Sequence, residues 1–129
     1  MTTPTREQTE EFFDRYARAL LARDEQAIAG MYGVPALILG EGIAIPVTDE
    51  QQTADFFASS WPQYAGVDDA TRRLAIMGSG PGTVWADVTW TYSGGPRERF
   101  CYQLAASDGV LRIVVLTPLE LDQDQLDQG

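Results

Sequence analysis

The sequence predicts an α+β fold in which a curved, mainly antiparallel sheet carries helices grouped on one face. Three observations predict it. The first half of the chain holds three segments with helix-capping patterns, and two short apolar runs interrupt them. The second half holds four strand-like segments separated by short turn-forming clusters. At 129 residues the chain has the size of one domain, so we expect a core over about residues 5–119 and a mobile tail at 120–129.

The first helix is expected to run from Thr5 to Ala22. Thr5, followed by Gln8 three residues later, forms a capping-box pattern, in which each residue satisfies a backbone N–H of the other. Apolar residues then recur at the spacing of one helix face: Phe13, Tyr16, Ala17, Leu20 and Leu21.

A second, shorter helix and a tight hairpin are expected next. Asp24 is the predicted N-cap of a helix that includes Met31 and ends at Gly33. The apolar segments Ala36–Leu39 and Ile43–Val47 are too short for amphipathic helices, so we interpret them as two strands. The Gly-Glu-Gly between them supplies the glycines that a tight hairpin requires.

The third helix and an antiparallel meander complete the predicted order. Thr48 with Gln51 forms another capping-box pattern, which opens a helix that includes Trp61 and is kinked or ended by Pro62. Short turns make sequential antiparallel pairing the default for the strands that follow. These strands are Arg72–Gly78, Thr83–Tyr92, Arg97–Ala106 and Val110–Thr117.

The strand over residues 83–92 shows the clearest alternation. Its even positions are apolar and are expected to face the core, whereas Trp85 falls on the more polar face. Aromatic residues are enriched in protein interfaces, so Trp85 is either part of a homodimer contact through the sheet or a partly exposed side chain. The core-facing residues are Val84, Ala86, Val88, Trp90 and Tyr92.

The composition excludes several classes of function. A net charge of −10 repels phosphate backbones and anionic lipids, so neither nucleic acid nor membrane is an expected partner. The chain has no histidine, which removes the commonest general base and zinc ligand, and no metal or cofactor is expected. No apolar run is long enough to span a bilayer, and Cys101 is the only cysteine. These features favour a cytoplasmic protein.

The chain resembles the nuclear-transport-factor-2-like superfamily, which includes ketosteroid isomerases and SnoaL-like polyketide cyclases. The resemblance rests on FFDRYARALLARDEQAIAGMYGVPALIL, on a later helix with TADFFASSW, and on the four-strand meander. It covers roughly residues 6–119. It implies a cone-shaped fold with three helices from the N-terminal half packed on the concave face of an antiparallel or mixed sheet. It also implies a pocket between sheet and helices, and a homodimer formed through the sheet.

The catalytic pattern of ketosteroid isomerase is matched only in part. Tyr16 falls where the resemblance places the tyrosine of the first helix. The position of the carboxylate base falls on Gly40, one residue before Glu41, and the position of the acid falls near Cys101. A one-residue slip on a strand turns a side chain to the opposite face, so isomerase activity of that type is not expected. The absence of histidine counts against a close copy of a polyketide cyclase.

Two residues are candidates for catalysis, and each has a structural alternative. Glu41 is either the solvated tip of the hairpin or a general base over the mouth of the cone. Tyr16 is either a core residue with a hydrogen-bonded hydroxyl or a donor to a ligand carbonyl. Whether the chain is an enzyme is left open.

Cys101 is ambiguous in its direction. If Phe100 and Tyr102 face the core, alternation turns Cys101 to the other face, whereas the resemblance turns it into the pocket. It is either a small apolar filler or a thiol near Arg99. We interpret Arg97 and Arg99 as partners of Glu98 or of the acidic surface.

The favoured function is binding of a small, largely apolar molecule in the cone. The alternatives are proton transfer next to a carbonyl, of an isomerase, cyclase or dehydratase type, and a non-catalytic dimerisation or interaction domain. An open, partly polar cavity favours a ligand, and a collapsed cone favours the interaction domain. The expected ligand-binding residues are Tyr16, Phe57, Trp61, Trp90, Cys101, Tyr102 and Gln103.

Overall fold

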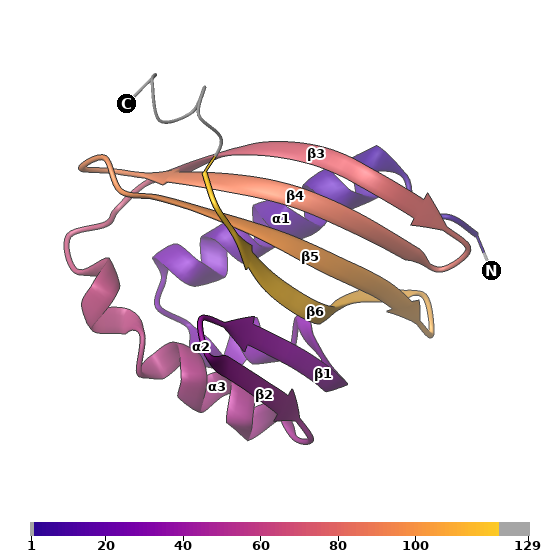
Figure 1. The fold of residues 1–129 in the computed structure, drawn as a ribbon, viewed down its shortest axis with the longest axis horizontal. Coiled ribbons are helices and arrows are strands. Elements are labelled where there is room, and N and C mark those ends of the chain that lie inside the picture. Colours follow the sequence, from indigo (N-terminus) through magenta and orange to yellow (C-terminus); the bar gives the residue numbers. More distant parts are fainter. Residues whose placement is uncertain (1, 122–129) are drawn as a thin grey trace.

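The computed structural model describes residues 2–121, which form three α-helices, a 3₁₀ helix and six strands. Figure 1 shows the helices beside a curved sheet. The helices are α1 (Arg6–Leu21), α2 (Glu25–Ala29) and α3 (Glu50–Ala58), followed by a 3₁₀ helix, η1 (Trp61–Tyr64). The strands are β1 (Tyr32–Gly40), β2 (Ile43–Val47), β3 (Ala70–Gly80), β4 (Thr83–Tyr92), β5 (Arg97–Ser107) and β6 (Val110–Leu119). Most of the tail predicted to be mobile lies outside the described residues.

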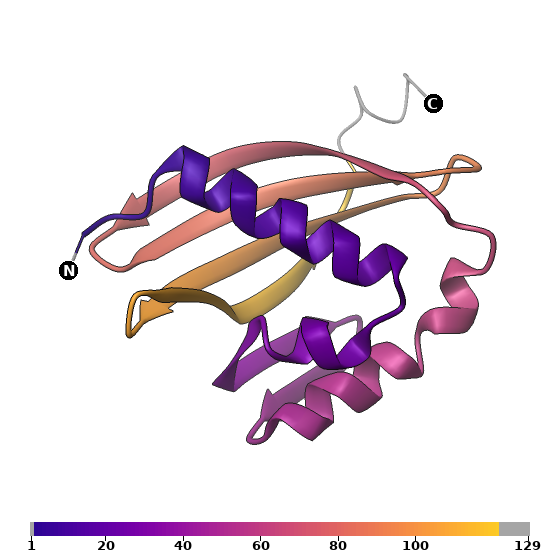
Figure 2. The ribbon, with the colours of Figure 1, turned by 180° about the vertical axis from the view of Figure 1, so that it is seen from behind.

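One mixed sheet in the order β2-β1-β6-β5-β4-β3 organises the fold. The four C-terminal strands pair sequentially and antiparallel, which confirms the predicted meander. The N-terminal hairpin joins it through a parallel pairing of β1 with β6. In Figure 2, α1 runs across the concave face of the sheet, while α2 and α3 lie beside the β1–β2 hairpin. The predicted α+β cone with helices on its concave face is therefore confirmed.

The caps that begin the helices largely follow the sequence. The Thr5 side chain accepts from the backbone N–H of Gln8 at 3.1 Å, and the Gln8 side chain accepts from that of Thr5 at 2.9 Å. In α3 the capping box is Asp49 with Gln52, so the predicted Thr48–Gln51 box was wrong by one residue. A carboxylate also interacts favourably with the positive end of the helix dipole, which favours Asp49 as the cap.

The third helix ends earlier than predicted. It stops at Ala58, and Trp61 belongs to η1, where Pro62 occupies one of the first two positions. Proline has no N–H to donate and is therefore tolerated at the start of a helical turn.

The boundary between α2 and β1 also differs from the prediction. Helix α2 ends at Ala29 with Gly30 as its C-cap, so Met31 lies outside it and Gly33 lies inside β1. The carbonyl of Met31 accepts from the N–H of Ile113 at 2.8 Å, and this contact brings the chain onto β6. Because Ile113 is distant in the sequence, no local pattern indicated this early strand.

The core lies between the concave face of the sheet and α1. The predicted alternation of β4 is confirmed: its even positions are buried, and Trp85 on the other face is 38% exposed. From α1, Phe12, Phe13 and Tyr16 pack onto this face. Within residues 2–121, no helix is both long and apolar enough to cross a bilayer.

Candidate functional site

A cavity of about 810 Å³ opens between the concave face and the helices that cover it. Its walls are largely apolar and aromatic, with contributions from α1, the β1–β2 hairpin, the region from α3 to η1, and strands β4 to β6. It is lined by Tyr16, Leu20, Leu39, Gly40, Glu41, Ile43, Phe56, Phe57, Ser59, Ser60, Gln63, Tyr64, Trp90, Tyr92, Glu98, Phe100, Tyr102, Leu116 and Pro118.

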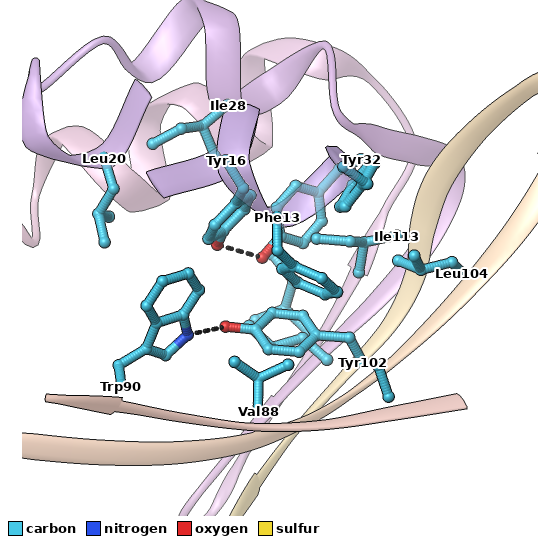
Figure 3. Packing of buried hydrophobic residues seen from close by; sticks show 14 of the residues in the cluster. Phe13, Tyr16, Leu20, Ile28, Tyr32, Val88, Trp90, Tyr102, Leu104 and Ile113 are labelled. Atoms are coloured by element: carbon cyan, nitrogen blue, oxygen red, sulfur yellow. Dashed lines mark hydrogen bonds between the residues drawn. The ribbon is translucent and has the colours of Figure 1, made fainter. Parts of the chain in front are cut away.

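Two hydrogen-bonded pairs of aromatic residues lie in the core, and three of these four residues, Tyr16, Trp90 and Tyr102, line the cavity. Figure 3 shows the packing of both pairs. The hydroxyls of Tyr16 and Tyr32 are 3.0 Å apart, and the indole N–H of Trp90 donates to the Tyr102 hydroxyl at 2.9 Å. All four side chains are buried. Because Tyr102 accepts from Trp90, its own proton remains to be donated, and we find no acceptor for it among the described residues. A ligand in the cavity can therefore receive a hydrogen bond from Tyr102.

These phenols are neutral at ordinary pH. Burial is the main reason that the pKa of Tyr16 lies well above its usual value, and the hydrogen bond and proximity of Tyr32 raise it further. Burial likewise raises the pKa of Tyr102. The hydroxyls can thus orient a polar group of a ligand without adding charge to the cavity.

A second polar group lies where β5 approaches η1. Oε1 of Glu98 accepts from the Tyr64 hydroxyl at 2.8 Å and from the Tyr92 hydroxyl at 2.9 Å. Burial is the main cause of the raised pKa of both tyrosines, and the negative charge of Glu98 raises both further. The same three residues also border a smaller pocket of about 190 Å³. Glu98 is half-buried, and its carboxylate is held in place by two neutral donors.

The sequence interpretation missed Glu98 as a cavity residue. Its place between Arg97 and Arg99 led to its assignment as an ion-pair partner of these arginines. Arg99 instead forms a two-point ion pair with Asp87, with N–O distances of 2.6 and 2.9 Å. The available signal was the alternation of the strand, since Glu98 shares a face with the inward-facing Phe100 and Tyr102.

Arg23 holds the segment that carries Tyr64. Its guanidinium donates to the carbonyls of Tyr64 at 2.5 Å and Val67 at 2.8 Å, and to that of Leu21 at 2.9 Å. These bonds connect the end of α1 to η1, 41 residues later in the chain. Arg23 is therefore a positioning residue for the Tyr64 hydroxyl, and it does not line the cavity.

The cavity brings together five of the residues predicted for the site: Tyr16, Glu41, Phe57, Trp90 and Tyr102. Trp61, Cys101 and Gln103, which belong to the expected ligand-binding set, lie outside the lining. Trp61 packs against Phe57 and Tyr64 beside the cavity, with ring centroids 6.3 and 6.2 Å away. The Gln103 amide lies 3.4 Å from the Thr83 hydroxyl on the outer face of the sheet.

Cys101 also points to the outer face. Its neighbours Phe100 and Tyr102 line the cavity, and the Cys101 Sγ lies 3.8 Å from the Sδ of the exposed Met77. The pairing of β5 with β4 is regular at this position, so alternation determines the direction and the pocket-facing orientation implied by the resemblance is wrong. Partial burial and Asp87 raise the pKa of the thiol, against a smaller lowering by Arg99. This environment does not activate a thiolate.

Glu41 shows features of both a solvated hairpin tip and a carboxylate at the mouth of the cone. It is exposed in the turn between β1 and β2, and it borders the cavity at its rim. The turn depends on Gly42, whose φ of 68° lies in the left-handed region. Within the described part of the chain, Glu41 has no hydrogen bond or ion pair. Tyr16, by contrast, is buried and is already bonded to Tyr32.

Comparison with known proteins shows similarity in structure and not in sequence. No protein-family model and no curated protein matches the chain. A nuclear-transport-factor-2-like protein from Cytophaga hutchinsonii superposes with a TM-score of 0.69 at 9% identity, over 92% of this chain and 99% of its own. An uncharacterised protein with a cystatin-like fold from Caulobacter vibrioides superposes with a TM-score of 0.67 at 14% identity, over 95% of this chain and 93% of its own.

Aln2 from a Streptomyces species is also similar, with a TM-score of 0.64 and 18% identity over 97% of this chain and 96% of its own. At such low identities the similarity concerns the fold, and a fold does not determine a function. The order of the elements, the curved mixed sheet and these superpositions agree with one another, and the chain therefore has the nuclear-transport-factor-2-like fold.

Proposed function

We propose that the protein binds a small, largely apolar molecule in the cavity under α1 and α3. The observation that carries this proposal is an open cavity of about 810 Å³ that has both apolar walls and fixed polar groups. Ligand sites typically measure about 300–1,000 Å³ and are lined by apolar side chains with a few placed polar groups. In a cone used only for dimerisation we would expect side chains to fill this volume, because unfilled apolar space loses packing energy.

The cavity offers two means of holding such a ligand. Apolar surface is supplied by Leu20, Leu39, Ile43 and Leu116. Burying apolar area of a ligand against such side chains contributes about 25 cal/mol per Å² to the free energy of binding. The hydroxyl of Tyr102 then fixes the orientation, because its proton has no acceptor among the described residues. Proton transfer next to a carbonyl receives less support, since Tyr16 is bonded to Tyr32 and Glu41 lies at the exposed rim.

A thermal-shift screen against steroids, polyketides and small aromatic acids and amines tests the proposal. A ligand at about 100 times its dissociation constant adds about 2.7 kcal/mol to the free energy of unfolding. Ser60→Trp places an indole in the cavity. The control variant, Gln51→Trp, introduces the same side chain at an exposed position of α3 outside the lining. We expect the shift to be lost in the first variant and kept in the second. No shift with any compound class, or an unchanged shift in Ser60→Trp, would contradict the proposal.

We propose in addition that two copies associate through the outer face of the sheet. Met77 and Trp85 lie on this face and are 62% and 38% exposed, and Cys101 lies next to Met77. Large apolar side chains on adjacent strands are the kind of surface that interfaces bury. The cavity opens on the opposite face, so association of this kind leaves the ligand site accessible.

A further inference from the structure

The charged residues that line the cavity are all acidic. Of the residues that line it, Glu41 and Glu98 are acidic and none is basic. All nine basic residues of the chain are arginines, so no lysine can supply an amine to a ligand anion. The nearby Arg23 uses its guanidinium on backbone carbonyls outside the lining. An anionic ligand would therefore enter a negative environment without a counter-charge.

Glu98 contributes this negative charge inside the cavity. Burial is the main cause of the raised pKa of Tyr16, Tyr64, Tyr92 and Tyr102, and the charge of Glu98 adds to the effect at each of them. Two tyrosines donate to its Oε1, and no partner of Oε2 is present among residues 2–121. The carboxylate is thus oriented in advance and keeps one oxygen available for a further donor.

Aromatic rings surround this carboxylate. Tyr64 and Tyr92 contact it directly through their hydroxyls, with ring centroids 5.4 Å apart in an edge-to-face arrangement. Trp90 and Phe100 belong to the same cavity wall. Aromatic faces attract cations, and a desolvated cation gains more from them than an exposed one. A carboxylate within an aromatic wall, without a neighbouring basic residue in the lining, is suited to an organic ammonium group.

We propose that the ligand is a hydrophobic amine whose protonated nitrogen binds Oε2 of Glu98 while its apolar body fills the cavity. This inference rests on the proposed function and adds the chemical class of the ligand. A charge-assisted hydrogen bond is roughly twice as strong as a neutral one, so the ammonium group provides discrimination between ligands of the same shape. Tyr64 and Tyr92 then act as positioning residues for the carboxylate.

Three compounds that share a naphthalene ring provide the test: 2-(1-naphthyl)ethylamine, 2-(1-naphthyl)ethanol and 1-naphthylacetic acid. Binding to the full chain at neutral pH is measured by calorimetry and by the change in tryptophan fluorescence, since Trp90 lines the cavity. We expect the amine to bind about tenfold or more tightly than the alcohol, and the acid to bind most weakly. This comparison uses the wild-type chain and depends on no variant.

Two variants locate the effect. Glu98→Gln keeps an acceptor for both tyrosines and removes the charge, and it should abolish the preference for the amine over the alcohol. Glu41→Gln removes the other carboxylate of the lining and should keep the preference. Equal binding of amine and alcohol by the wild type, or a preference that survives Glu98→Gln, would overturn the inference and leave the proposed function standing. If none of the three compounds binds, the inference is overturned, and the proposed function falls with it only if the thermal-shift screen also finds no ligand.

Discussion

The hydroxyls of Tyr16 and Tyr32 lie 3.0 Å apart and join α1 to the first residue of β1. Both side chains are almost completely buried, with 3% and 2% of their surface exposed. Each hydroxyl is the hydrogen-bond partner of the other, so the removal of one leaves the other without a partner in the core. Tyr16 lines the cavity and Tyr32 does not, which makes this pair a link between the stability of the fold and the candidate site.

Removing both hydroxyls of this pair should cost less than the sum of the two single removals. We expect Tyr16→Phe and Tyr32→Phe each to lower the free energy of unfolding by about 1–2 kcal/mol, because an unpaired buried hydroxyl remains. In the double variant no polar atom is left unpaired, so its loss should fall short of the sum of the single losses by about 1 kcal/mol. Urea unfolding of the four proteins measures this coupling. Strictly additive losses would show that the two hydroxyls do not interact.

The tyrosines should also make the fold sensitive to alkali. All five have pKa values raised above 10.0, mainly by burial. Because the pKa is higher in the folded state, this stability is complete below the unfolded value and is lost as pH rises toward the folded values. Each tyrosine that ionises only in the unfolded chain reduces the free energy of unfolding by about 1.4 kcal/mol per pH unit.

Tyrosinate absorbance and circular dichroism, followed together with increasing pH, measure this sensitivity. We expect the folded chain to show no ionisation step near pH 10, and tyrosinate to appear together with the loss of structure at higher pH. The chain in denaturant serves as the control and should titrate near the ordinary value. Ionisation of several tyrosines in a chain that stays folded would contradict the prediction.

Cys101 should react slowly with alkylating agents for its degree of exposure. Partial burial and Asp87 raise its pKa, so the thiolate forms at higher pH than in a free cysteine. Asp87→Asn removes one cause of the raised pKa and leaves Arg99, which lowers it, so the rate profile should move to lower pH. The rate of alkylation by iodoacetamide as a function of pH measures this. Asp55→Asn, at an exposed position of α3, is the matched control, and an equal displacement in both variants would refute the role of Asp87.

The proposed dimer can be tested at Trp85. Glu at this position would place a charge in the buried interface, and an unpaired buried charge is costly, so Trp85→Glu should give a monomer in sedimentation velocity experiments. Val110→Glu makes the same kind of change at an apolar residue that is 45% exposed at the start of β6, and it should leave the dimer intact. A wild-type chain that sediments as a monomer at all concentrations would exclude the association.

Much of the fold follows from patterns that span only a few residues. The box of Thr5 and Gln8, the cap at Asp24 and the alternation of β4 each depend on neighbours in the chain, and the structure confirms all three. The errors have two sources. Helix α2 ends early because β6 pairs with the residues that follow it, a contact that no local pattern indicates. At Cys101 the local alternation was right, and the error came from the orientation that the resemblance implied.

In the candidate site, too, local patterns predicted which residues face the interior but not which of them contact one another. From the sequence alone, the chain was predicted to carry Tyr16, Phe57, Trp90 and Tyr102 toward one interior, because hydrophobic periodicity identifies the inward face of a helix or strand. Only the tertiary structure placed the Tyr64 hydroxyl beside the Glu98 carboxylate, 34 residues later in the chain. The physical reason is that alternation determines the face on which a side chain lies, whereas its partner across the cavity depends on how the whole sheet curves and on how Arg23 holds η1 against α1.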